Sequence, residues 1–182
     1  MSSIRYSAAI THTSKTIHAL FRTQYYSYSK LRILLRFILG FILACSAVML
    51  SLPVWAKGIL IASGAWLIVS QDFPAQVRAD RVLQARGGKL PVMRYAFGDD
   101  GLNVSGEGSM DIPYAKISRL IHDSEYLYLF IMKDSVCMMD RPENSGEFMK
   151  FIAEKTGLEW QTVKSVFAMN IDDLKEIFLR KS

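Results

Sequence analysis

FILGFILACSAVMLSLPVWAKGILIASGAWLIV, from Phe37 to Val69, contains one formal charge, Lys57. Its first twenty residues, Phe37–Ala56, are uncharged, which is about the length one helix needs to cross a hydrocarbon core of roughly 30 Å. A second apolar run, Ile59–Val69, falls short of that length unless the residues after it extend the helix. We therefore expect residues 33–75 to form a hairpin of two transmembrane helices, and Pro53 is a possible early start of the turn.

The extension beyond Val69 contains Gln71 and Asp72, which then have to lie in the headgroup layer or face a partner group. A buried helical hairpin in a soluble protein is the alternative. The small residues of both runs, such as Gly40 and Gly64, would let two helices approach closely, although they are equally typical of any membrane helix.

Basic residues flank the apolar stretch on both sides. They are Lys30, Arg32 and Arg36 before it and Arg78 and Arg81 after it, whereas Lys57 alone falls in the expected loop. Because cytoplasmic flanks are enriched in Lys and Arg, this distribution predicts two membrane passes with both termini in the cytoplasm. The same residues account for much of the net charge of +5, so we interpret the charge as attraction to the lipid bilayer and not as a nucleic-acid site.

The remaining sequence divides into four pieces around the hairpin. Residues 1–32 show an alternating strand pattern from Ile4 to Ile10, which should join a sheet built elsewhere, and then an amphipathic helix. That helix either lies on the membrane or runs directly into the first span. Residues 76–89 extend the second span as a basic helix or linker that Gly87 and Gly88 should end. Residues 158–182 show two further helical patterns, the first of them containing Trp160 and Val163.

The sequence pattern of residues 90–157 predicts a small antiparallel β-domain closed by a helix. The expected strands are Val92–Phe97, Leu102–Ser105, Lys116–His122, Tyr126–Met132 and Val136–Asp140, separated by turn residues such as Asp99-Asp100-Gly101. Pro142 should stop the last strand, and Asn144 or Ser145 should cap a helix that ends near Gly157. Its apolar stripe of Phe148, Phe151 and Ile152 should cover the sheet. The fold class expected for the whole chain is thus an α+β membrane protein.

Three segments of the chain resemble the YcxB-like family of bacterial membrane proteins. They are Tyr95–Leu102, Ile112–Ile117 and Tyr126–Phe130, and the stretch Phe21–Lys30 is also similar. The resemblance implies two membrane helices in the inner membrane and a cytoplasmic domain similar to a pleckstrin-homology barrel. It brings no enzymatic activity, no catalytic residues and no cofactor, and likeness of fold does not carry over phosphoinositide binding.

Reactive constellations are missing from the sequence. His12, His18 and His122 lack a second histidine at metal-ligand spacing, and Cys45 and Cys137 are expected to be free thiols without a neighbouring base. We therefore expect no catalytic, metal or cofactor site, and we expect the protein not to be an enzyme.

Pro113, Tyr114 and Lys116 are the candidate contact residues. Either Tyr114 and Lys116 form a contact surface, or Pro113 shapes the start of a strand, Tyr114 packs and Lys116 faces water. The function expected is a non-catalytic membrane protein that binds a protein partner, or a second copy of itself, as a scaffold or regulator. The alternatives are a membrane-bound immunity protein that protects against a toxin and, less favoured, a membrane enzyme.

Overall fold

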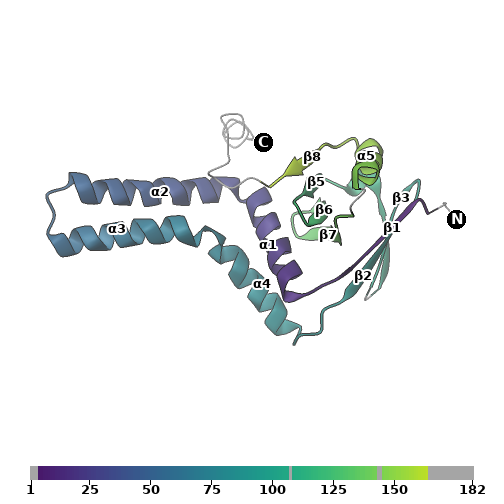
Figure 1. The fold of residues 1–182 in the computed structure, drawn as a ribbon, viewed down its shortest axis with the longest axis horizontal. Coiled ribbons are helices and arrows are strands. Elements are labelled where there is room, and N and C mark those ends of the chain that lie inside the picture. Colours follow the sequence, from purple (N-terminus) through teal and green to yellow (C-terminus); the bar gives the residue numbers. More distant parts are fainter. Residues whose placement is uncertain (1–3, 107, 143–144, 164–182) are drawn as a thin grey trace. The chain divides into compact units, whose positions relative to one another are not determined.

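The computed structural model describes residues 4–106, 108–142 and 145–163 (Figure 1). They form two compact units, one made by residues up to Leu20 together with Arg81–Val163 and the other by Phe21–Asp80. The first unit carries the strands and the second the apolar helices, so the chain is α+β as expected.

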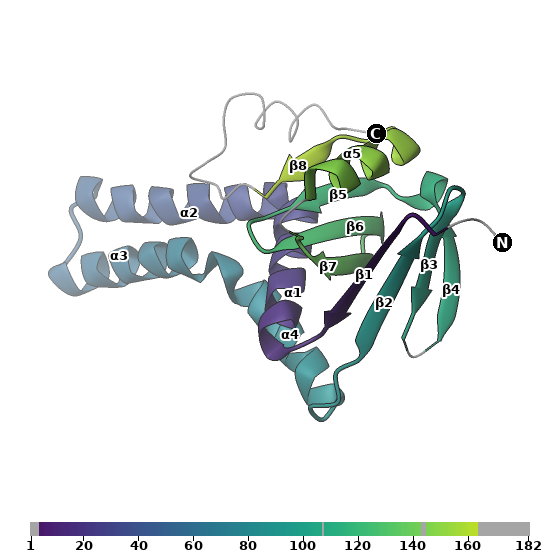
Figure 2. The same cartoon turned by 45° about the vertical axis from the view of Figure 1, so that its right-hand side comes forward.

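The apolar hairpin consists of α2 (Lys30–Met49) and α3 (Val54–Val69), which run side by side in both views (Figures 1 and 2). The predicted first span of Phe37–Ala56 was placed too late, because α2 begins at Lys30 and ends at Met49. Pro53 precedes the first residue of α3 with φ −56°, the angle its ring imposes, so it does start the turn early. Lys57 consequently lies within α3 and not in the loop.

The second apolar run, Ile59–Val69, is too short to span a membrane alone, and further helical residues follow it as expected. A 3₁₀ turn, η1 (Ser70–Asp72), connects α3 to α4 (Phe73–Ala85). Gly87 and Gly88 follow α4 with φ of +55° and +79°, a left-handed conformation that glycine adopts without a steric cost. The predicted helical extension and its glycine stop are both confirmed.

The N-terminal residues form the strand and helix that the sequence predicts, β1 (Tyr6–Thr11) and α1 (Ser14–Tyr28). A reciprocal cap begins α1, because Thr13 N–H donates to Thr16 Oγ1 (2.8 Å) and Thr16 N–H donates to Thr13 Oγ1 (3.3 Å). Ser29 lies between α1 and α2, so α1 does not run uninterrupted into the first span.

The first sheet has the order β1-β2-β3-β4 and is antiparallel throughout, with β2 at Val92–Phe97, β3 at Gly101–Ser105 and β4 at Ser109–Pro113. We call it sheet A. Tyr6 pairs with Phe97 and Thr11 with Val92, so the N-terminal strand does join strands that follow the hairpin. Strand β4 was not expected, and Pro113 ends this strand instead of starting one.

The second sheet, sheet B, has the order β7-β6-β5-β8. Its strands are β5 (Arg119–His122), β6 (Tyr126–Met132), β7 (Ser135–Asp140) and β8 (Trp160–Thr162). The expected strand Lys116–His122 is shorter than predicted, because Tyr114–Lys116 form the 3₁₀ turn η2. The helix predicted around Trp160 is wrong, since β8 is a strand parallel to β5. The other helical pattern of the tail lies outside the described residues.

Helix α5 (Ser145–Thr156) covers the β-strands through the predicted apolar stripe. Phe148, Phe151 and Ile152 are buried, and the Phe148 ring meets those of Phe97 and Tyr6 at centroid distances of 4.8 and 5.4 Å. Gly157 follows with φ +67° and ends the helix where the sequence predicts. The residues of α5, β1 and β2 thus share one core.

Candidate functional site

Helices α2 and α3 expose most of their apolar side chains. Two helices of the structure, Lys30–Met49 and Val54–Ala85, are long and apolar enough to cross a membrane, and only 22% and 17% of their apolar windows are buried. The exposed side chains include Phe41, Ile42, Val48, Ile59 and Trp66. By length and composition the two helices are therefore candidates for membrane spans.

The two helices touch through their glycines. A Cβ atom on Gly64 would lie 2.5 Å from the Gly40 carbonyl oxygen, and one on Gly40 would lie 2.8 Å from that of Gly64. Both glycines are buried, as is Ala47. This is backbone-to-backbone packing of the kind that small residues permit between membrane helices.

Helix α3 gives way to α4 at a joint that Pro74 creates. Pro74 has no N–H, so it cannot donate the helical bond that the Ser70 carbonyl would otherwise receive. That carbonyl accepts from Phe73 N–H and from Arg36 Nη2 (3.3 Å), and the same guanidinium nitrogen donates to Ser70 Oγ (3.0 Å). Arg36 of α2 thereby caps the last turn of α3.

The carboxylate of Asp72, in the same joint, is bound by two side chains of α1. It accepts a short hydrogen bond from the Tyr26 hydroxyl and pairs with Arg22 Nε at 3.3 Å, both from α1. Burial, and then the bond to Asp72, raises the pKa of Tyr26 to about 12, so the phenol keeps its proton. Beside Asp72, Gln71 is buried, and its Nε2 has no hydrogen-bond partner among the described residues.

The predicted flanking cations occupy the helices around this joint. Lys30 is the first residue of α2, Arg32 is exposed, and Arg78 and Arg81 are exposed on α4. The guanidinium of Arg36 is engaged in the cap of α3. That these cations flank membrane spans stays a prediction, and the sequence gave no sign that Arg36 caps a helix.

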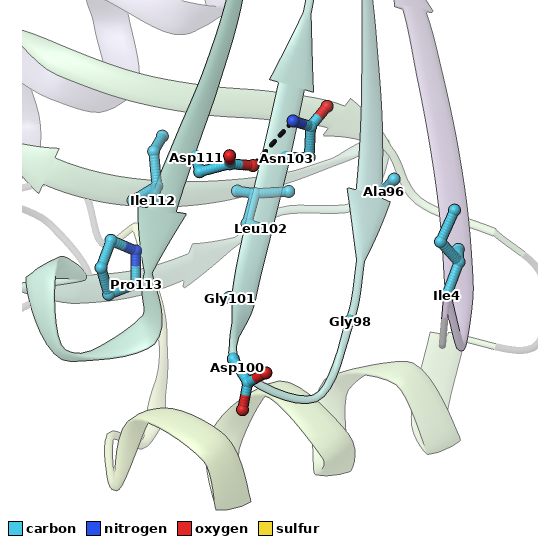
Figure 3. Close-up of a pocket in the computed structure, with 10 residues that line it drawn as sticks. All are labelled: Ile4, Ala96, Gly98, Asp100, Gly101, Leu102, Asn103, Asp111, Ile112 and Pro113. Carbon is cyan, nitrogen blue, oxygen red and sulfur yellow. Dashed lines mark hydrogen bonds between the residues drawn. The ribbon is translucent and has the colours of Figure 1, made fainter. Parts of the chain in front are cut away.

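A separate hollow of about 440 Å³ opens on the outer face of sheet A (Figure 3). It lies at the end of the sheet where β2 turns into β3 and β4 ends. The residues lining it come from the first four strands and their connections: Ile4, Ala96, Gly98, Asp100, Gly101, Leu102, Asn103, Asp111, Ile112 and Pro113. Its charged side chains are two carboxylates, Asp100 and Asp111.

Strand register explains why this hollow forms. Ala96 pairs with Asn103, and Asn103 with Asp111, so these three side chains stand in one row across the outer face. Ala96 and Gly98 place no large side chain in this space. Asn103 Nδ2 donates to Asp111 Oδ1 (2.7 Å) and to Ser109 Oγ (3.2 Å), the first of which Figure 3 shows. Donors of Asn103 are thus engaged within the row, while carboxylate oxygens remain as acceptors.

Asp99 and Asp100 follow one another but have different surroundings. Asp99 Oδ1 accepts from Arg5 Nε (2.9 Å), and Lys155 Nζ lies 3.6 Å from the same oxygen and donates to the Asp99 carbonyl (2.9 Å). Gly98 N–H donates to Gly101 O, which confirms the predicted turn. Asp99 is thus compensated by two cations, whereas Asp100 contributes its charge to the hollow.

The two candidate contact residues have different positions. Tyr114 is buried, its hydroxyl donates to Gly98 O (2.8 Å), and its ring meets Phe151 edge to face at 6.2 Å. Burial raises the pKa of Tyr114 to about 12. Tyr114 therefore packs in the core, as one of the two interpretations expects, and a contact surface at these residues stays a prediction. Lys116 is exposed, and its role in binding stays a prediction.

The described residues contain no group of three or more His, Cys, Asp or Glu side chains placed to hold a metal ion. Cys45 and Cys137 are free thiols, and burial raises the pKa of Cys137 to about 12, which removes thiolate reactivity at neutral pH. Asp123 is occupied structurally, because its carboxylate accepts from the backbone N–H groups of Glu125 and Tyr126 and from the Tyr128 hydroxyl.

No protein-family model matches the chain, and no curated protein or solved structure matches it at a significant level.

Proposed function

We propose that this chain is a two-pass inner-membrane protein that presents an α+β binding module in the cytoplasm and has no chemistry of its own. The exposure of α2 and α3 carries the proposal, because a lipid environment would cover the apolar side chains that the described part of the chain leaves exposed. The exposed cations Arg32, Arg78 and Arg81 fit the headgroup layer of anionic lipids.

The pairing of β1 with β2 supports the topology independently of charge. Strand β1 precedes both apolar helices in the chain and β2 follows them, yet Tyr6–Thr11 and Val92–Phe97 form one antiparallel ladder. Two segments in the same sheet have to lie on the same side of a bilayer. If α2 and α3 cross the membrane, they therefore cross it as a pair and return the chain to its starting side.

The arrangement of the strands supports likeness to the YcxB-like family and to pleckstrin-homology domains. Sheet A is an antiparallel meander, β5–β7 form a second one, and α5 closes the core through Phe148 and Phe151. The parallel strand β8 is a departure from a simple meander. A binding role is favoured because the polar side chains described above cap helices, order turns or line an open hollow.

Fractionation and reporter fusions test this proposal. The full-length protein should stay in the membrane pellet after washing with alkaline carbonate and should leave it only with detergent. Reporters fused before Tyr6 and after Val163 should both report the cytoplasm, whereas one inserted between Leu50 and Pro53 should report the opposite side. Release by carbonate would overturn the anchor, and fusions on opposite sides would overturn the paired crossing.

A further inference from the structure

The outer edge of β4 is an open strand edge next to the acidic hollow. Strand β4 is the last of sheet A, and Figure 2 shows it at the outer side of the sheet. Among the described strands, β5 has its free edge covered by β8, whereas Ser109, Met110 and Asp111 of β4 are exposed. An uncovered edge offers backbone groups that another strand can bind.

The alternation of hydrogen-bonded and non-hydrogen-bonded pairs between β3 and β4 shows which backbone groups of β4 point away from sheet A. Gly106 N–H donates to Gly108 O, so in an antiparallel ladder the pairs Val104–Met110 and Leu102–Ile112 exchange the bonds between β3 and β4. A Cβ atom on Gly101 would lie 2.7 Å from the Ile112 carbonyl oxygen, which confirms that this carbonyl points toward β3. The alternate residues Ser109 and Asp111 therefore direct their N–H and C=O groups away from the sheet.

The side chains of β4 differ between the two faces of sheet A, so they favour two kinds of partner residue. Asp111 stands on the outer face beside the hollow, where Asp100 adds a second carboxylate. Met110 stands on the opposite face, and 63% of it is exposed although it is apolar. A partner residue directly opposite Asp111 would place its side chain next to the carboxylate, while its two neighbours would lie beside Met110 and Ile112.

We propose that β4 accepts an extended peptide segment with the pattern apolar–basic–apolar, added to sheet A as a fifth strand. The Lys or Arg side chain of that segment enters the hollow and pairs with Asp111, and the flanking apolar side chains cover Met110. A second copy of this chain does not fit, because antiparallel pairing of two β4 strands brings the two Asp111 carboxylates opposite or adjacent to each other. This inference deepens the binding role proposed above and rests on it.

Peptide binding to the detergent-solubilised full-length protein tests the inference. The probe is a fluorescein-labelled peptide Thr-Val-Lys-Val-Thr, and the comparison peptide is Thr-Val-Glu-Val-Thr, both with blocked ends. Fluorescence anisotropy should show the lysine peptide binding at least about tenfold more tightly than the glutamate peptide, which corresponds to about 1.4 kcal/mol. Asp111→Lys should reverse this preference. Asp134→Lys, an equal change of charge in the β6–β7 turn, should preserve it.

Ser109→Pro tests the backbone part of the interaction. It removes one outward N–H and no backbone bond to β3, although it does remove the exposed side-chain bond from Asn103 Nδ2 to Ser109 Oγ. The thermal midpoint should therefore fall little while the lysine peptide binds several-fold more weakly. If Asp111→Lys fails to fold, Asp111→Asn keeps an acceptor for Asn103 and should still lose the preference for lysine. Equal binding of both peptides to the wild type, or an unchanged preference in a folded Asp111 variant, would overturn the inference. Membrane extraction and topology do not depend on Asp111, so the anchor can stand when this site fails.

Discussion

The Gly40 carbonyl oxygen on α2 lies 2.5 Å from the position that a Cβ atom on Gly64 of α3 would occupy. Neither backbone can move aside as a flexible side chain could, because both atoms belong to regular helices. This contact therefore determines how closely the two halves of the hairpin approach.

Gly64→Ala should separate α2 from α3 at this point. Overpacking of this kind costs about 1–3 kcal/mol, which should lower the thermal midpoint of the solubilised protein by several degrees. Gly58→Ala is the matched control on the same helix, because a Cβ atom there would meet nothing within 4 Å. Equal midpoints for the two variants would show that the close approach is not required.

Arg36→Leu should destabilise the joint between α3 and α4. It removes one of the two donors to the Ser70 carbonyl, leaving Phe73 N–H, and it also removes the donor to Ser70 Oγ, at a cost of about 1–2 kcal/mol. Arg32→Leu removes an exposed cation one helical turn earlier and should change the midpoint little. If both variants behave alike, Arg36 acts only through its charge at the membrane surface.

Asp123→Ala should destabilise sheet B without removing any activity. The change takes away an acceptor shared by two backbone N–H groups and the buried Tyr128, and we expect a loss of about 2 kcal/mol in the free energy of unfolding. Ser124→Ala in the same turn is the control. Near-UV circular dichroism against temperature would measure the loss.

His12 should make stability sensitive to mild acid. Burial, and then the positive charge of Arg86, lowers the pKa of His12 from its ordinary value of 6.5. Between pH 7 and 5 the unfolded chain therefore takes up this proton more readily than the folded protein does, and stability present above pH 6.5 is lost as the pH falls. His12→Gln should make the thermal midpoint depend less on pH between pH 7 and 5. A variant with the same acid sensitivity as the wild type would assign the effect to another group.

Periodicity and composition predicted the apolar hairpin, β1, the extension of α3 and the cap at Gly157, because each depends on residues close together in the sequence. The start of α2 was missed since Lys30 and Arg32 interrupt the apolar pattern without interrupting the helix. Strand β8 was missed because Trp160 and Val163 have helical spacing, whereas its partner strand lies about forty residues earlier.

The hollow on sheet A could not be read from the sequence in the same way. Asn103 lies in a predicted strand and Asp111 lies outside the predicted strands, so only the register of β3 and β4 places them opposite each other. Ala96 enters the row from a third strand. Alternation of small or polar residues with buried ones in β2 and β3 was the available signal. This alternation identifies which side chains of a strand point outward, but it does not show which side chains lie next to them on neighbouring strands.

Strand β1 is synthesised long before β2, the strand with which it pairs. Thr11 precedes its partner Val92 by 81 residues, and at ~5–20 residues per second a ribosome needs roughly 4–16 s to make that interval. Both apolar helices, α2 and α3, are synthesised within this interval, while β1 still has no ladder to join. Strand β1 consequently reaches its final place only after both apolar helices and β2 have been made.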